Sequence, residues 1–473
     1  MTRLPEAIIH LIQSFLSEEE VARTTLISKS WYKAWLTRPV LVLRSSAAEF
    51  SKLAVKTMRR YQDSNLKIEG LSLKIEGATS SVEPVARRLI VDAMKMGATD
   101  LNIEFILPKS VPTTFVLPAE VLGSETLLRL SVIGCVIDGN VVNCSMLKSL
   151  SLDNVVLKRA DMLRIMTSYC NSIEELSLSN THLISNYKLI LSGWDMHWLR
   201  KLKRLYLEMV TVGSLFFDNL ESRFPCLEDM SLVRCCCHPR LVKSSSLKRI
   251  SIVQCPELRI MFEVPNLAVF SYSGEHVPWS ISIKARDGWE SHISMEVHHF
   301  QTSSWYRDLH KLMTSSWYRE LHMLLTQLSS SRINLSININ IGSRSGYVSD
   351  ISMSDILRVV AKPVAVENLR VEAENDVGRI MRCLFRICRP KLVTLCWLDS
   401  EVWISDDEHS LKNLCEKLMP SKKRRRNMFK VFDLKEGKVE VYEEDVAEWR
   451  PLLLQDALTT PPTGRKVRFH LKW

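Results

Sequence analysis

The chain opens with apolar residues spaced as one face of an α-helix. The members of this face are Ile8, Ile9, Ile12, Phe15 and Leu16. Their recurrence about every three to four residues matches the helical period. The helix is predicted to begin at Leu4-Pro5-Glu6, because Pro5 is tolerated in a first turn, where no N–H bond is lost.

Two further short helices are predicted before residue 40. Ser17 and Glu20 have the spacing of a capping box for a second helix, which carries Val21. Ser28 can cap a third helix, which Pro39 stops. A segment of about 40 residues rarely folds stably alone, and three short helices cannot hide this much apolar surface from each other. The rest of the chain or a partner protein must cover it.

An apolar pattern L-x-x-L-x-L, with substitutions, recurs through the middle of the chain. Copies begin at Leu127, Leu147, Ile173, Leu202, Leu227, Leu247 and Leu267. Their spacing of about 20 to 29 residues is that of leucine-rich repeats. Each copy predicts a strand whose fourth and sixth residues face inward, and such repeats stack into a solenoid. The fragments Leu71-Ser72-Leu73 and Leu101-Asn102-Ile103 are candidate degenerate members.

Cysteines support the repeat interpretation. A leucine-rich repeat favours Asn or Cys three residues after the sixth position, buried in the turn that follows the strand. Cys135, Cys235 and Cys255 occupy that position, whereas the other repeats have Val155, Thr181, Val210 and Glu275 there. The run Cys235 to His238 resembles a metal cluster, but adjacent side chains of an extended chain point in opposite directions. A buried ladder position for Cys235 is the preferred interpretation, and no metal site is expected.

Residues beside the inward positions are predicted to form the exposed strand face. Its charged and aromatic members are Arg129, Glu175, Arg204, Tyr206, Glu208, Asp229 and Arg249. Mixed charge with one aromatic residue suits recognition of a target protein. A merely solvated strand face is the alternative.

The last third of the chain has weaker patterns. TSSWYRDLHKLM at 302–313 is nearly repeated as TSSWYRELHMLL at 314–325, and a helix would rotate the second copy by about 120°. One copy is therefore interpreted as extra helix or surface loop. Strands are predicted at 333–341, 366–371, 391–398 and 467–473, and helices at 352–360 and 411–418. A hairpin is expected at 430–442, with its turn at Glu436-Gly437.

Composition indicates a folded protein that stays in a reducing compartment. The 473 residues are 46% hydrophobic and 25% charged, with a net charge of +10. No apolar stretch is long enough to span a membrane, and the start lacks the basic region of a secretory signal. We therefore expect the nucleus or cytoplasm, no membrane partner, and 12 free thiols.

A basic run, Lys422 to Arg426, supplies much of the positive charge. It could act as a nuclear-import signal or contact phosphate, but a solvated loop is the simpler interpretation. Aromatic residues do not interleave with it, so nucleic-acid binding is not expected. Nucleotide, zinc-protease and serine-hydrolase motifs are absent from the sequence, and His298 and His299 should face apart on a strand. Neither enzyme activity nor a cofactor is predicted.

The string LPEAIIHLIQSFLSEEEVARTTLISKSWYKAWL resembles an F-box over residues 3 to 44. It has the leading Leu-Pro, a helix ending in Phe-Leu, an acidic second helix, and Ser-Lys-x-Trp-x-x-x-Trp at its close. An F-box followed by degenerate leucine-rich repeats is typical of a family of plant proteins. The segment from Val264 to Gly274 and the C-terminal region, which is similar to the FBD type, also resemble that family.

This resemblance implies an α/β fold with three parts. They are an F-box of three helices (1–44), an irregular leucine-rich-repeat solenoid or horseshoe (60–345), and an α/β C-terminal region (346–473) that is either a domain or a continuation of the solenoid. The implied function is a non-catalytic substrate-recognition subunit of a Skp-cullin-F-box (SCF) ubiquitin ligase. Its partners would be a Skp-type adaptor, through it a cullin, and an unknown target protein. A leucine-rich-repeat scaffold without a ubiquitin role is the alternative.

The resemblance also assigns residues. Those implied to face the adaptor or support the interface are Leu4, Pro5, Ile8, Ile9, Ile12, Phe15, Leu16 and Val21. Trp31 and Trp35 would hold the helices together or pack on the following domain.

Overall fold

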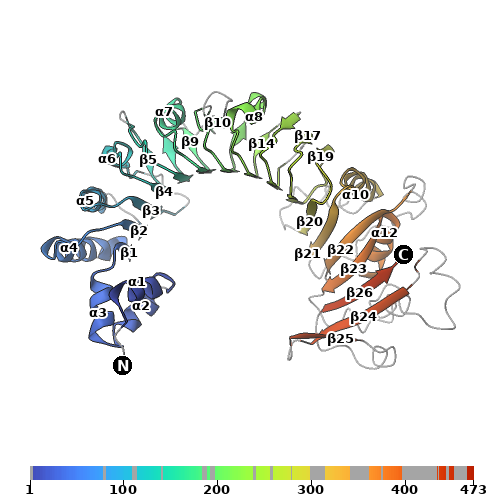
Figure 1. Cartoon of the computed structure of the whole chain (residues 1–473), viewed down its shortest axis with the longest axis horizontal. Helices are drawn as coiled ribbons and strands as arrows, with labels where there is room; N and C mark the ends of the chain where they lie inside the picture. The colour runs from blue at the N-terminus through green and yellow to red at the C-terminus, as the bar shows by residue number, and fades with distance from the viewer. Residues whose placement is uncertain are drawn as a thin grey trace. The chain divides into compact units, whose positions relative to one another are not determined.

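The computed structural model has a mixed α/β fold with a large sheet, which confirms the predicted fold class at that level (Figure 1). It describes residues 4–16, 18–77, 81–108, 114–139, 142–183, 189–191, 196, 198–237, 241–255, 259–278, 280–298, 315–340, 362–373, 377–396, 434, 436–443, 447–451 and 466–473. The chain forms two compact units, Met1–Phe216 with Leu220–Leu227, and Phe217–Asn219 with Glu228–Trp473. The domain boundaries predicted at residues 44 and 345 stay predictions.

The first unit begins with three short helices, α1 (Glu6–Ser14), α2 (Glu18–Thr24) and α3 (Lys29–Leu36). Pro5 occupies the N-cap of α1, where its missing N–H costs nothing. Ser28 occupies the N-cap of α3, but its hydroxyl makes no capping hydrogen bond. Ser28 is therefore at the predicted N-cap position, without a side-chain hydrogen bond, while Ser17 lies outside the described residues.

A parallel sheet forms the rest of the first unit. Its strands follow the chain in the order β1 (Val40–Ser46), β2 (Gly70–Glu76), β3 (Asp100–Ile106), β4 (Arg129–Ile133), β6 (Ser149–Asp153), β8 (Glu175–Ser179) and β11 (Arg204–Glu208). Helical segments between or after them are α4 (Ala47–Asp63), α5 (Glu83–Lys95), α6 (Ala119–Leu122), α7 (Met162–Tyr169), η1 (Ser214–Phe216) and α8 (Leu220–Arg223). Short strands β5 (Val136–Ile137), β7 (Val156–Leu157) and β9 (His182–Leu183) form a second ladder, and β10 (Ile190–Leu191) pairs with β12 (Thr211–Val212).

The second unit also begins as a parallel sheet. Its order is β13 (Asp229–Val233), β16 (Arg249–Val253), β18 (Val269–Gly274), β20 (Glu290–His298), β21 (Arg332–Asn340), β22 (Val364–Ala373) and β23 (Cys388–Cys396). Antiparallel strands β26 (Lys466–Lys472), β24 (Glu436–Glu443) and β25 (Glu448–Pro451) continue it. The other elements are β14 (Cys236–Cys237), β15 (Leu241–Lys243), β17 (Arg259–Glu263), β19 (Ser280–Lys284), α10 (Ser315–Gln327) and α12 (Val377–Ile387).

The predicted repeat strands are confirmed. Each strand begins two residues after the first residue of its pattern, as β4 does after Leu127 and β16 after Leu247. The fourth and sixth residues are buried throughout, for example Leu130 and Val132. Because side chains alternate along a strand, one face is apolar and the other polar. The degenerate fragments at Leu71 and Leu101 lie in β2 and β3.

A turn of constant geometry follows the strands. Asn154, Asn180 and Gln254 have positive φ angles of 49°, 44° and 49°. The N–H of Asn154 donates to the carbonyl of Ser179 at 3.0 Å, at the end of the neighbouring strand. Gly134 occupies the equivalent place after β4, with φ 69° and an N–H bond to the carbonyl of Asp153. Neighbouring repeats are thus tied at this rim as well as along the sheet.

The C-terminal predictions are partly confirmed. The four predicted strands correspond to β21, β22, β23 and β26 over the residues described. The predicted hairpin turn is wrong, because Glu436 and Gly437 lie inside β24, opposite Lys472 and Leu471. Strand β24 instead pairs with β25, which follows it. The predicted helices at 352–360 and 411–418, the basic run and the first copy of the duplication lie outside the described residues, whereas the second copy lies in α10.

Substituting Gly134 with Ala should destabilise the first unit. The new Cβ would lie 2.2 Å from the carbonyl oxygen of Phe105, in addition to the strain of a positive φ. We expect a cost above about 2 kcal/mol, measured by urea unfolding followed by circular dichroism. Gly77→Ala is the matched control, because Gly77 has φ 66° but open space around it. Equal losses for both variants would contradict the close approach.

Candidate functional site

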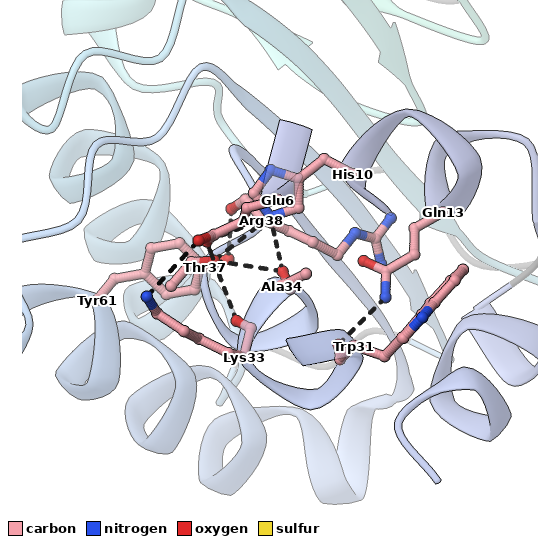
Figure 2. A network of polar contacts seen from close by, with 9 residues as sticks. All are labelled: Glu6, His10, Gln13, Trp31, Lys33, Ala34, Thr37, Arg38 and Tyr61. Atoms are coloured by element: carbon pink, nitrogen blue, oxygen red, sulfur yellow. Dashed lines mark hydrogen bonds and ion pairs between the residues drawn. The ribbon is translucent and has the colours of Figure 1, made fainter. Parts of the chain in front are cut away.

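A polar network fixes α1 on α3 (Figure 2). The Thr37 hydroxyl, just beyond α3, donates to the Glu6 carboxylate. On the next turn of α1, His10 Nε2 donates to the carbonyl of Ala34 at 2.9 Å. Lys33 Nζ lies 3.6 Å from Glu6 Oε2. These contacts orient one side of α1 toward α3.

The centre of the three helices is filled by both polar and apolar groups. The amide of Gln13, which is fully buried, donates to Thr24 Oγ1 at 3.2 Å and to the carbonyl of Trp31 at 3.5 Å. Gln13 therefore joins α1 to α2 and α3. Ile9 and Val21 are also buried, with exposed fractions of 1% and 0%. Removing such a side chain would collapse the helices rather than alter their surface.

Two contacts hold the helices on α4. The Tyr61 hydroxyl donates to the carbonyl of Arg38 at 2.8 Å, and both residues appear in Figure 2. The Arg60 guanidinium lies 5.4 Å from the centroid of the Trp35 ring, within the range of a cation–π interaction. Trp35 thus contacts an element beyond the three helices, which corresponds to one of the two roles predicted for it.

The opposite side of α1 exposes large apolar side chains. We call this set the apolar face; its members are Leu4, Ile8, Leu11, Ile12 and Phe15. Phe15 is 81% exposed and Ile8 is 42% exposed. A helix has 3.6 residues per turn, so this spacing gathers the five side chains into one stripe. Leu26 and Ile27, between α2 and α3, are exposed as well.

The structure divides the residues predicted to bind an adaptor into two groups. Leu4, Ile8, Ile12 and Phe15 are on the apolar face, Pro5 is exposed beside it, and Leu16 is half-buried. Ile9 and Val21 lie inside the helices, so they can only support a surface. Leu11, Leu26 and Ile27 were missed, although Leu11 follows Ile8 by one helical turn and the spacing could have identified it.

The residues predicted to bind a target are largely paired with one another. Acidic and basic side chains occupy the same register position of neighbouring parallel strands, so they face each other along the sheet. The pairs are Asp100 with Arg129, Glu175 with Arg204, Asp229 with Arg249 at 2.6 Å, and Glu290 with Arg332 at 2.5 Å. Tyr206 donates to Glu208 at 2.8 Å. The charges on this face are therefore mostly compensated, and target binding there stays a prediction.

The buried ladder after the strands has the composition that the sequence predicts. Cys135, Cys235 and Cys255 are buried, and their thiols donate to the carbonyls of Ile133, Val233 and Val253 at 3.4 to 3.6 Å. The Thr181 hydroxyl makes the same bond to the carbonyl of Ser179 at 3.2 Å. Val155 and Val210 are buried at this position without a polar group, whereas Glu275 is half-buried.

Burial makes the thiols of Cys135 and Cys388 poor nucleophiles. It raises the pKa of Cys135, and it raises the pKa of Cys388 to about 12. Cys236 is exposed between two buried neighbours, and His238 lies outside the described residues. Within the part of the chain that the structure describes, no three His, Cys, Asp or Glu side chains are grouped as metal ligands. No described helix is long and apolar enough to cross a membrane.

Comparison with known proteins identifies relatives, although no family model matches the chain. A putative F-box/FBD/LRR-repeat protein of Arabidopsis thaliana is 26% identical over 213 residues, which cover 44% of this chain and 47% of the relative. A putative F-box/LRR-repeat protein of the same plant is 28% identical, covering 38% of this chain and 36% of the relative. An FBD-associated F-box protein is 30% identical, with coverage of 37% and 42%. The matches span less than half of each relative, and they confirm the predicted resemblance.

Replacing Thr37 with Val should raise the pKa of Glu6 toward its ordinary value. The Thr37 hydrogen bond is the main cause that lowers this pKa, with help from Lys33 and His10. A lowered pKa stabilises the folded state above pH 4.5, and that contribution is lost as the pH falls through the folded-state pKa. Because the carboxylate is 42% exposed, the difference should stay below about 1 kcal/mol at neutral pH.

The pKa of Glu6 can be followed by NMR of its carboxyl carbon, and helix stability by hydrogen exchange of α1. Thr25→Val is the control, because the Thr25 hydroxyl donates to the carbonyl of Ala22 and not to a carboxylate. A Glu6 pKa that is unchanged in Thr37→Val would show that the hydroxyl is not its main partner.

The folded chain should react with iodoacetamide at Cys226 and Cys236, but not at Cys135 or Cys388. The first two thiols are exposed and the last two are buried with raised pKa values. Mass spectrometry of digests from native and urea-unfolded protein would measure the difference. Native labelling of Cys388 as fast as that of Cys226 would contradict the packing of α12 against the sheet.

Proposed function

We propose that this relative of plant F-box/LRR-repeat proteins is the non-catalytic substrate-recognition subunit of an SCF-type ubiquitin ligase. Helices α1 to α3 form the F-box and dock on a Skp-type adaptor, which joins the chain to a cullin. The following repeats form an irregular leucine-rich-repeat solenoid that receives the target protein. The subunit contributes proximity: it raises the effective concentration of the target at the ubiquitin-transferring subunits.

The exposure of the apolar face is the observation that supports this proposal. Fully burying one large aliphatic or aromatic side chain is worth about 1.5 to 3 kcal/mol. Five such side chains exposed on one stripe therefore favour binding of a partner that removes them from water. The polar network and Gln13 fix the opposite side of α1, so the helix cannot turn its apolar face inward without losing those bonds. A partner that covers this face gains the free energy of apolar burial, and the entropic cost of ordering the helix is already met by these contacts.

The proposal that the repeats receive the target protein is supported by polar side chains on their strand face. The charged side chains of the strand face already have ion-pair partners, so they do not require opposite charges on a target. The half-buried polar side chains between them can still form hydrogen bonds with a target. Ser231, Ser251 and Ser271 form one such row, in register on β13, β16 and β18. Specific recognition by such a face would depend on shape and on a few residues rather than on net charge.

Charged substitutions on the apolar face should abolish adaptor binding without unfolding the chain. We expect Ile8→Asp and Phe15→Asp to weaken capture by a purified Skp-type adaptor at least about tenfold, because each would bury an unpaired carboxylate in the interface. Val55→Asp on α4 is the matched control, since Val55 is a 52% exposed apolar residue on another helix.

Ile9→Asp is unsuitable as a test, because Ile9 is buried and the helices themselves would fail. Surface plasmon resonance gives the affinities, and circular dichroism confirms the fold of each variant. Equal adaptor binding by wild type, Ile8→Asp and Phe15→Asp would refute the ubiquitin-ligase assignment and favour a leucine-rich-repeat scaffold without that role.

A further inference from the structure

A charged groove of about 490 Å³ lies on the C-terminal strands of the second unit. Its wall is built by β23, β24 and β26, and it contains three lysines, one histidine and two glutamates: Lys391, Lys438, Lys472, His470, Glu436 and Glu440. Its volume is within the range of ligand-binding pockets. The opposite side of the same strands is apolar, with Val439 and Phe469 buried. The groove is therefore on the polar side of a fixed sheet.

The charges in the groove follow the antiparallel register of β24 and β26. Glu436 faces Lys472, with 3.5 Å between their charged atoms. Four residues further along β24, Glu440 faces Arg468 of β26 and forms an ion pair with it. Opposite charges at directly facing positions stabilise a sheet, so both rows are complementary.

The row between them breaks this rule. Lys438 faces His470, which places two basic side chains opposite each other. The imidazole of His470 lies 3.1 Å from Glu440 Oε2, so His470 and Arg468 both contact the carboxylate of Glu440. Lys438 is exposed and has no ion pair or hydrogen bond with another described residue. Lys438 is thus the residue of the middle row without a carboxylate partner among the described residues, which marks it as a candidate functional position.

We infer that this groove binds an anionic side chain of a peptide segment, with Lys438 as its principal cation. Lys472 and Lys391 also line the groove, but each already has a carboxylate partner, Glu436 at 3.5 Å and Glu367 at 2.7 Å, so Lys438 is the groove lysine that is left for a ligand. The two glutamates would repel a continuous polyphosphate backbone but tolerate a single negative charge placed at the middle row. The observations thus favour a short acidic peptide over nucleic acid. This inference rests on the proposed function in one respect, namely that the peptide belongs to the recruited target.

The substitution Lys438→Glu reverses the charge of the middle row. The new carboxylate would face His470 but would also lie between Glu436 and Glu440 on the same face of β24, so the stability of the sheet is measured alongside binding. Binding of a fluorescein-labelled peptide containing one isolated Glu or one phosphoserine should fall at least about tenfold in anisotropy titrations at low ionic strength. Comparison of the carboxylate and phosphoserine peptides shows which anion the groove prefers.

Lys56→Glu on α4 is the matched control, because Lys56 is an exposed lysine in the other unit and does not line this groove. Lys438→Ala should give an intermediate loss, since it removes one charge without adding another. The full chain is used throughout, and thermal unfolding is measured for every variant.

Three results would overturn the inference. They are unchanged peptide binding by Lys438→Glu, a loss of binding that tracks a loss of stability, and tighter binding of a single-stranded oligonucleotide that depends on Lys438. Adaptor capture is measured on the same variants and does not involve the groove. Normal capture with no peptide binding would therefore reject only this site, whereas peptide binding with no capture would reject only the ubiquitin-ligase proposal.

Discussion

The parallel backbone ladder between successive strands is the interaction on which the rest of this structure depends. A single strand has one apolar face and two edges of unpaired backbone groups, and neither is stable in water. In each unit the next strand along the chain satisfies one edge and extends the apolar layer, as β4 does for β3 and β16 for β13. Because the register is constant, equivalent residues of successive repeats lie side by side.

This register determines the chemistry of the polar face. It places Leu beside Leu in the core, but it would equally place like charges beside each other on the open side. The sequence avoids this by alternating sign, so Glu175 meets Arg204 and Asp229 meets Arg249. The same rule holds in the antiparallel strands at the end of the second unit. Lys438 opposite His470 departs from it, which is why that row is informative.

The three N-terminal helices solve a different problem, because they have no sheet to extend. Their stability comes from a small centre in which Gln13 makes hydrogen bonds to two helices and Ile9 and Val21 are buried. In that arrangement one side of α1 packs against α2 and α3, and the other side exposes Ile8 and Phe15 to solvent. The division follows from the 3.6-residue period, since a single narrow helix cannot bury all of its circumference against two neighbours.

The sequence by itself determined the strands of the repeats and the burial of their fourth and sixth residues. It also placed Cys135, Cys235 and Cys255 correctly in the buried ladder, because these features repeat and depend on local alternation. It did not predict α12, whose apolar residues lie between two strand-like runs. It also placed the turn of a hairpin at residues that lie inside β24. A Glu-Gly pair is a local turn signal, but the pairing of β24 with β26 overrides it.

Only the tertiary structure decided which apolar residues of α1 are buried and which charges are paired. Ile8 and Ile9 are the same residue type on adjacent positions, yet one is 42% exposed and the other 1%. Likewise, no local pattern tells Arg249, which has Asp229 beside it, from Lys438, which has His470. Burial and ion pairing depend on which segments distant in sequence lie against a residue, and those neighbours are set by the packing of the whole unit.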